Sequence, residues 1–157
     1  DVRTDASVLT TAVMTSVAIA LQVGDLVSNI TFKSGATAAG TPANYWFALY
    51  SADATPALVG QSADQTSTAW AANTVKTLAL TTPYRVPVTG VYYAAIMVKA
   101  STPPTLLGAS LGLAGASASI LSSKVLAQTS GSALTDTAPA TIASPTAIAS
   151  VPFAVLT

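Results

Sequence analysis

Apolar and polar side chains alternate with a period of two along several short segments of this chain. Large apolar residues stand at every second position from Val17 to Val23, and a similar alternation follows over Leu26–Lys33. This spacing is typical of β-strands, because successive side chains of a strand point to opposite faces. The alanines are interspersed with threonine, serine and valine, which favour strands and turns over helices. The pattern predicts an all-β protein.

Gly24 and Asp25 lie between the first two alternating segments. A glycine at the first position of a two-residue turn is a signal for a tight β-hairpin. We therefore expect the two flanking segments to pair as neighbouring strands. Leu26 begins the second segment on the same face as Ile30 and Phe32, the face expected to point into the core.

Two longer segments, Ala43–Ser51 and Gly90–Lys99, are apolar on both alternating faces. In the first, Tyr45 and Phe47 alternate with Trp46. A strand with two apolar faces is expected to be central and covered on both sides. Further short strands are expected at Leu58–Ser62, Thr74–Leu80, Lys124–Gln128 and Ile148–Leu156.

Seven to nine strands separated by turn signals predict a β-sandwich of the jelly-roll type. No linker divides the chain, so residues 1–157 are expected to form one domain. Residues 1–10 are a candidate N-terminal arm, and residues 108–145, rich in Ala, Ser and Thr, have a weaker pattern. Pro152 cannot donate a ladder hydrogen bond, so its strand is expected at an edge or a bulge. Thr82 and Pro83 are expected to end the strand before them.

The composition excludes several kinds of chemistry. Only 8% of the residues are charged, the formal net charge is zero, and the chain has no His, Cys or Glu. A Cys/His zinc site, a Ser-His-Asp triad and a cysteine nucleophile are therefore impossible. A neutral chain also has no electrostatic attraction to nucleic acid. We expect no enzymatic activity, no cofactor and no nucleic-acid partner.

Four stretches lack charge over about the length of a membrane-spanning helix, roughly 17–25 residues. Each is diluted by Ser, Thr, Gly or Pro, so we expect no membrane insertion. The N-terminal residues lack the basic region of a signal peptide. An average soluble domain carries roughly 25% charged residues. The low charge here predicts a surface that is buried against identical copies or a larger particle.

Trp70 and Tyr84 are the aromatic candidates for ligand binding. Trp70 lies in a polar segment together with Gln65 and Asn73. Exposed aromatic faces stack on sugars, and amides supply hydrogen bonds. The four residues are therefore candidate glycan ligands. In the alternative interpretation, which the residues favour, Trp70 packs over the end of the sandwich or against another subunit.

Asp53 and Asp64 flank the short predicted strand Leu58–Ser62. Their carboxylates could share a cation such as Ca²⁺, which prefers oxygen ligands. Their spacing matches no EF-hand loop, and aspartates in turns commonly cap their own backbone. We expect this capping role, and therefore no metal site.

The middle of the chain shows a set of features shared with a known group of proteins. They are an aromatic strand ending in Ala48-Leu49-Tyr50, then Gln61-Ser62-Ala63-Asp64, Lys76-Thr77, Thr82-Pro83-Tyr84, Gly90-Val91-Tyr92-Tyr93 and Pro104-Thr105-Leu106. With these and with Leu21–Phe32, the chain resembles β-sandwich domains in virion surface proteins of tailed bacteriophages. The similarity is to minor tail and fibre proteins of phages that infect actinobacteria.

The resemblance implies a structural protein of the virion that attaches the particle to the host surface. Such modules are commonly homotrimers, contact other virion proteins and have no enzymatic activity. Loops such as Asp64–Asn73 and Arg85–Gly90 would be presented to the host, with a cell-surface glycan as a candidate ligand. The chain has no coiled-coil stem. A capsid decoration protein is therefore an alternative, and a free-standing carbohydrate-binding module is a second one.

Overall fold

The computed structural model describes residues 4–110 and 124–157 and contains strands but no helix in these ranges. The strands are β1 (Thr4–Val8), β2 (Met14–Leu21), β3 (Leu26–Lys33), β4 (Gly40–Tyr50), β5 (Leu58–Gln61), β6 (Val75–Arg85), β7 (Gly90–Thr102), β8 (Thr105–Ser110), β9 (Ala127–Ser130), β10 (Thr146–Ala147), β11 (Ser150–Pro152) and β12 (Ala154–Leu156). The all-β prediction is confirmed. The expected number of strands is too low. β1 and β8 lie where no strand was expected, and the C-terminal part is divided into several very short strands. Residues 1–3 of the candidate arm and 111–123 of the Ala-rich segment lie outside the described residues.

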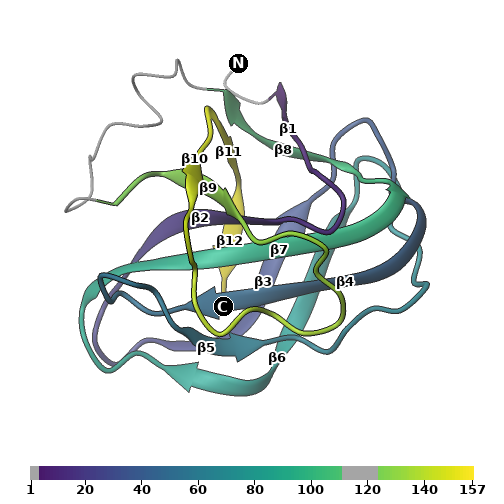
Figure 1. The fold of residues 1–157 in the computed structure, drawn as a ribbon. Coiled ribbons are helices and arrows are strands. Elements are labelled where there is room, and N and C mark those ends of the chain that lie inside the picture. The colour runs from purple at the N-terminus through teal and green to yellow at the C-terminus, as the bar shows by residue number, and fades with distance from the viewer. Residues whose placement is uncertain (1–3, 111–123) are drawn as a thin grey trace.

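The described strands pair in antiparallel fashion in three sheets. A six-stranded sheet has the order β10-β9-β2-β7-β4-β5, and two three-stranded sheets have the orders β12-β3-β6 and β1-β8-β11. In Figure 1, β3 and β12 lie behind the six-stranded sheet, and β1 and β8 run above it. This layering is consistent with a β-sandwich. Within the described ranges, nothing helical has the length and apolarity to cross a membrane.

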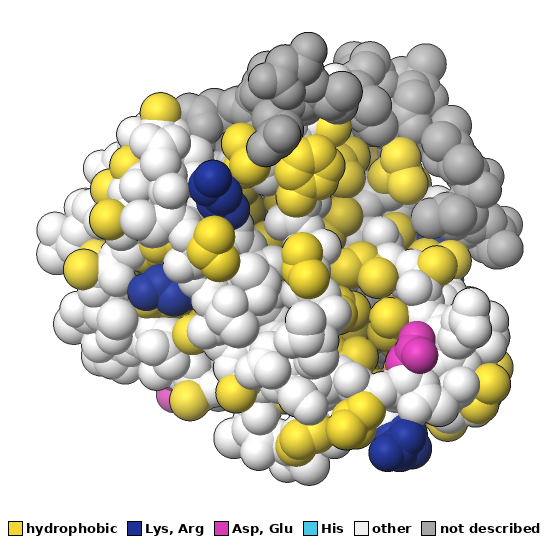
Figure 2. Space-filling model, turned by 180° about the vertical axis from the view of Figure 1, so that it is seen from behind, with side chains coloured by type: hydrophobic (Ala, Val, Ile, Leu, Met, Phe, Trp, Pro, Cys, Tyr) yellow, Lys and Arg dark blue, Asp and Glu magenta, His cyan; other side chains and the backbone are white. Residues whose placement is uncertain are grey.

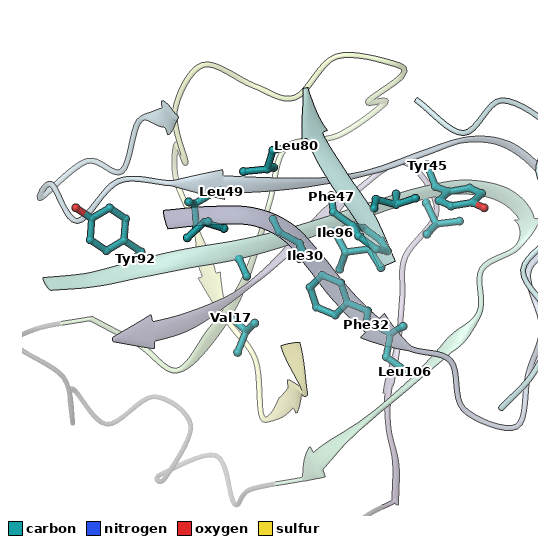
Figure 3. Packing of buried hydrophobic residues seen from close by; sticks show 14 of the residues in the cluster. Val17, Ile30, Phe32, Tyr45, Phe47, Leu49, Leu80, Tyr92, Ile96 and Leu106 are labelled. Atoms are coloured by element: carbon teal, nitrogen blue, oxygen red, sulfur yellow. The ribbon is translucent and has the colours of Figure 1, made fainter. Parts of the chain in front are cut away.

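The main core lies between the six-stranded sheet and the sheet that contains β3 and β6. Phe47 of β4 and Ile96 of β7 face Ile30 and Phe32 of β3, as Figure 3 shows. The rings of Phe32 and Phe47 meet edge to face, with their centroids 4.9 Å apart. Leu106 of β8 closes the same cluster. The side of this core that faces β4 and β7 is therefore built from β3, β6 and β8, which are distant from one another in sequence.

The opposite face of β4 and β7 forms a second core, and none of the sheets formed by the described residues covers it. Trp46, Tyr50 and Tyr93 lie on this face. Residues 131–145, which we call the strap, cross it between β9 and β10, and Figure 1 shows this segment running over the front of the sheet. Ala138 and Ile142 of the strap are buried in this second core.

Side chains of the sheet supply hydrogen bonds to the irregular backbone of the strap. The Trp46 indole N–H donates to the Thr135 carbonyl at 2.8 Å, and the Tyr50 hydroxyl donates to the Pro139 carbonyl at 2.8 Å. The Gln61 amide donates to the Asp136 carbonyl and accepts from the Ala138 N–H. Buried backbone groups without such partners would be costly. The prediction that β4 is covered on both sides is therefore confirmed, with a loop as one of the covers.

The predicted hairpin at Gly24 and Asp25 is wrong. β2 pairs with β7 and β9, whereas β3 pairs with β6 and β12. Gly24 does turn the chain, with φ of +93°, but the turn carries it from one sheet to another. The Gly24 N–H donates to the Val86 carbonyl at 2.8 Å, and the Arg85 guanidinium donates to the Gly24 carbonyl at 2.9 Å. The turn is therefore fixed by hydrogen bonds between Gln22 and Asp25 and by contacts with the end of β6, and not by strand pairing between β2 and β3.

A β-bulge changes which residues of β3 point into the core. The register with β6 shifts between Val27 and Asn29. Leu26, expected to point inward, is 48% exposed, and Val27 is 2% exposed instead. Ile30 and Phe32 beyond the bulge are buried as predicted. From the Val27–Tyr84 pair to the Asn29–Ala79 pair, β3 advances by two residues and β6 by five, and the alternation of β3 reverses at this irregularity.

Two prolines lie in strands at sheet edges. Pro152 is in β11, an edge strand, which confirms its predicted place. Pro83 was expected to end its strand, but β6 continues to Arg85. This extension is possible because β6 is also at the edge of its sheet, where a missing N–H removes no ladder bond.

Two buried tyrosines of β4 offer a matched test of the strap. Tyr50→Phe removes the hydrogen bond to Pro139, so we expect the free energy of unfolding to fall by about 1 kcal/mol. The Tyr45 hydroxyl is buried without a hydrogen-bond partner among the described residues. Tyr45→Phe should therefore leave the stability unchanged or raise it. Urea unfolding of the two variants measures both effects, and equal losses in the two would contradict this account.

Candidate ligand-binding depression at the end of the sheet

A depression of about 460 Å³ lies where β4 ends and β7 begins. Its walls come from the turn after β4, from the loop between β6 and β7, and from Lys124, which precedes β9. The polar side chains that line it are those of Ser51, Asp53, Tyr84, Thr89, Tyr92 and Lys124. We refer to it as the Tyr84 depression.

Two tyrosines and one glycine shape this depression. The rings of Tyr84 and Tyr92 are tilted against each other with centroids 6.3 Å apart. The Tyr92 hydroxyl donates to the Val88 carbonyl at 2.9 Å and so holds the loop between β6 and β7. A Cβ atom on Gly90 would stand 2.8 Å from the Cβ of Ala52, so only glycine lets the two walls approach this closely.

The turn after β4 is built around Ser51. Its hydroxyl donates to an Asp53 carboxylate oxygen at 2.6 Å and accepts from the Ala57 N–H at 2.9 Å. The Asp53 backbone carbonyl accepts from the Lys124 ammonium at 2.8 Å. The same ammonium lies 5.4 Å from the centroid of the Tyr93 ring, within the range of a cation–π contact. Lys124 is therefore fixed at the rim of the depression.

The surroundings of Tyr84 and Lys124 shift the pKa values of these two side chains. Burial is the main effect that raises the pKa of Tyr84, and the neighbouring Tyr92 and Asp53 raise it further. Tyr84 is therefore protonated at neutral pH, and its hydroxyl can both donate and accept a hydrogen bond. Burial also lowers the pKa of Lys124, while the charge of Asp53 opposes that change.

The lining groups suit binding better than catalysis. They include one carboxylate, that of Asp53, so the paired carboxylates of a glycosidase are missing from the described lining. No cluster of three potential metal ligands occurs among the described residues. What the depression does offer is part of an aromatic face, several hydroxyls and one charge of each sign. These groups match a ligand with many hydroxyls.

Trp70 has no exposed face to offer a ligand. Its side chain is 1% exposed, and its ring lies 5.8 Å from the centroids of both Tyr45 and Phe47. Its indole N–H donates to the Thr74 carbonyl at 3.3 Å. As a correction to the glycan-platform hypothesis, this ring packs in the core of its own chain.

Gln65 and Asn73 hold the segment that carries Trp70. The Gln65 N–H donates to the Tyr45 carbonyl, and its side-chain amide donates to the carbonyl of Ala63. Asn73 has φ of +55° and donates its N–H to the Gly35 carbonyl at 2.7 Å. Neither residue lines the Tyr84 depression. Of the four candidate ligand residues, only Tyr84 is part of it.

Asp64, the second candidate for a shared cation, belongs to a different turn. One of its carboxylate oxygens accepts from the Thr66 hydroxyl and from the Asn44 amide, both at 2.7 Å. Asp53 is engaged with Ser51 as described above. The two aspartates therefore lie in separate turns. Their carboxylates accept from side chains in the described part of the chain, and the expected cap on their own backbone is not seen.

No pattern in the sequence places Lys124 near the other residues that line the depression. Lys124 is separated from Tyr92 by a long stretch of chain, and no motif links them. The loop Arg85–Gly90, in contrast, was expected to be presented at the surface, and it does form one wall. Comparison of the chain with protein-family models, with curated proteins and with solved structures finds no match.

Trp70→Ala tests the core role of the indole. The substitution removes a fully buried ring, so we expect the free energy of unfolding to drop by about 3–5 kcal/mol. Trp70→Phe retains an aromatic ring and should lose much less. Thermal unfolding followed by circular dichroism compares the variants. If Trp70→Ala were as stable as the unmodified chain, the ring could not be the core element described above.

Proposed function

We propose that this chain is a structural protein of a bacteriophage virion surface, a non-enzymatic tail- or fibre-type module that attaches the particle to its host. Its fold would be a β-sandwich of the jelly-roll type, assembled as a homotrimer with other virion proteins. The Tyr84 depression would hold a cell-surface glycan. The observation that carries this proposal is a preformed depression with an aromatic wall, several hydroxyls and one carboxylate.

The geometry of the depression supports attachment in two ways. Its walls are two connections anchored on the long strands β4, β6 and β7, so the ligand groups need little ordering when they bind. Its volume of about 460 Å³ falls in the range of sites for small ligands, roughly 300–1,000 Å³. A sugar unit of a surface glycan is of the size that such a site accepts.

The outer surface of the molecule supports assembly with other proteins. Figure 2 shows the side on which β3 and β12 lie, where uncharged polar and apolar side chains far outnumber charged ones. On the sheet formed by β12, β3 and β6, Val75 and Val155 are 61% and 55% exposed. Thr31 of β3 is paired with Thr77 of β6, and their hydroxyls are 2.8 Å apart. Such a face can be buried at little desolvation cost.

This sparsely charged face also favours the alternative function, a capsid decoration protein that docks broadly on the head of the particle. The two functions differ in where the chain lies on the virion. Immunogold labelling of intact particles should place the label on the tail. Label on the head alone would replace attachment by decoration, and particles without label would overturn a virion role altogether.

Tyr84→Ala tests glycan attachment at the depression. Loss of the aromatic wall should weaken binding of the purified protein to host cells by about tenfold, which is about 1.4 kcal/mol. Phe153→Ala is the matched control, because Phe153 is an aromatic residue that is 43% exposed and does not line the depression. Flow cytometry with fluorescent protein measures the binding. Equal binding by Tyr84→Ala and the unmodified protein would contradict the proposed role of the depression.

A further inference from the structure

A second depression lies beside the first, on the other side of Lys124. It has a volume of about 410 Å³ and is bounded by the turn after β4, by Tyr93 of β7, by β9 and by the strap. Apolar groups of Pro56, Val125, Ile142, Pro145 and Ala147 form much of its wall. Lys124 lines both depressions, so the two sites share one edge.

Gln128 of β9 is one of the polar side chains that line the second depression, together with those of Thr55, Tyr93, Lys124 and Ser144. Gln128 is 4% exposed, and no side-chain hydrogen bond among the described residues involves its amide. It lines the depression from a rigid position, because its backbone pairs with Ser16 of β2 on one side and with Ala147 of β10 on the other. Unlike the hydroxyls of Ser16 and Ser130, the Gln128 amide is not fully enclosed by protein. It is open to the depression, where a ligand can supply the hydrogen bonds that the described residues do not.

Two serines lie next to Gln128 in the sheet, although neither of them lines the depression. The hydroxyls of Ser16 and Ser130 are buried without a hydrogen-bond partner in the described part of the chain. Ser16 is directly opposite Gln128 and Ser130 is two residues further along β9, so all three side chains belong to the same face of the sheet. Lys124 uses one ammonium N–H on Asp53, and an ammonium group has three.

The chemistry of this site specifies its ligand. A glutamine amide presents an acceptor oxygen next to a donor nitrogen, and the complementary group is another amide. The apolar wall would accept a small methyl group beside that amide, and Lys124 would meet hydroxyls at the rim. An acetamido group on a sugar ring combines all three features.

We propose that the second depression binds the acetamido group of an N-acetylated sugar, with Gln128 as its hydrogen-bonding partner. The inference rests on the proposed function, because it assumes that the ligand is a surface glycan. It uses a different set of side chains from the Tyr84 depression, with Lys124 alone in common. The two can therefore be tested separately.

The experiment is an NMR titration of the ¹⁵N-labelled protein, because the Gln128 side-chain amide gives its own pair of N–H signals. The probes are N-acetylglucosamine, N-acetylgalactosamine, glucose and an N-acetyl-lysine peptide. We expect at least one N-acetylated sugar to shift the Gln128 signals with an affinity on the order of millimolar. Glucose, which has a hydroxyl in place of the acetamido group, should bind at least about tenfold more weakly.

Gln128→Leu should weaken binding of the N-acetylated sugar at least about tenfold without loss of thermal stability, because no protein hydrogen bond is removed. Gln65→Leu is the matched control, since Gln65 lies outside both depressions. It should bind the sugar as the unmodified protein does. Binding unchanged by Gln128→Leu would overturn the assignment.

The other outcomes are equally decisive. If neither N-acetylated sugar shifts the Gln128 signals, or if the acetylated peptide binds more tightly than both, the inference fails. Host-cell binding that is lost in Tyr84→Ala and intact in Gln128→Leu would retain the attachment function and reject this second site. Loss of the sugar response in Gln128→Leu with no host-cell binding by any form would retain the site and reject attachment.

Discussion

The structure depends on burying both faces of one strand. From Tyr45 to Tyr50, every side chain of β4 is fully buried, and adjacent side chains point to opposite sides. A strand of this kind needs two separate covers. β3 and β6 provide the first through the core around Phe47, and the strap provides the second over Trp46 and Tyr50. Most of the remaining described strands extend either the sheet that contains β4 or the sheet formed by β3 and β6.

The two covers meet the requirement by different physical means. A sheet satisfies its own backbone, so β3 and β6 contribute mainly apolar contact. The strap is irregular and must find partners elsewhere, and it finds them in side chains of the sheet such as Trp46 and Gln61. This second cover also creates a binding surface, because Ile142 of the strap lines the depression that contains Gln128. The same segment thus closes a core and forms part of a candidate site.

Both depressions lie where strands end, and this position follows from the composition of the chain. The centres of β4 and β7 are apolar and fully enclosed, so polar groups that can reach a ligand are found at their ends and in the connections. The few charges in this region, those of Asp53 and Lys124, are engaged with their neighbours. A site built from hydroxyls, amides and tyrosine rings is suited to neutral, hydroxylated ligands.

Local features of the chain were sufficient to predict strands β2 to β7, the double burial of β4 and the edge position of Pro152, but not the strands β1 and β8. These depend on alternation and on the chemistry of single residues. The hairpin and the inward face of Leu26 could not be predicted, since the pairing of β3 with β6 and β12 and the bulge near Val27 depend on partners far away in sequence. The same holds for Lys124 and Gln128, which only the packing of distant segments brings to the end of the sheet. Sequence alone determined that β4 and β7 have two apolar faces to bury, and the tertiary structure decided what covers them, because contact between distant segments leaves no local pattern.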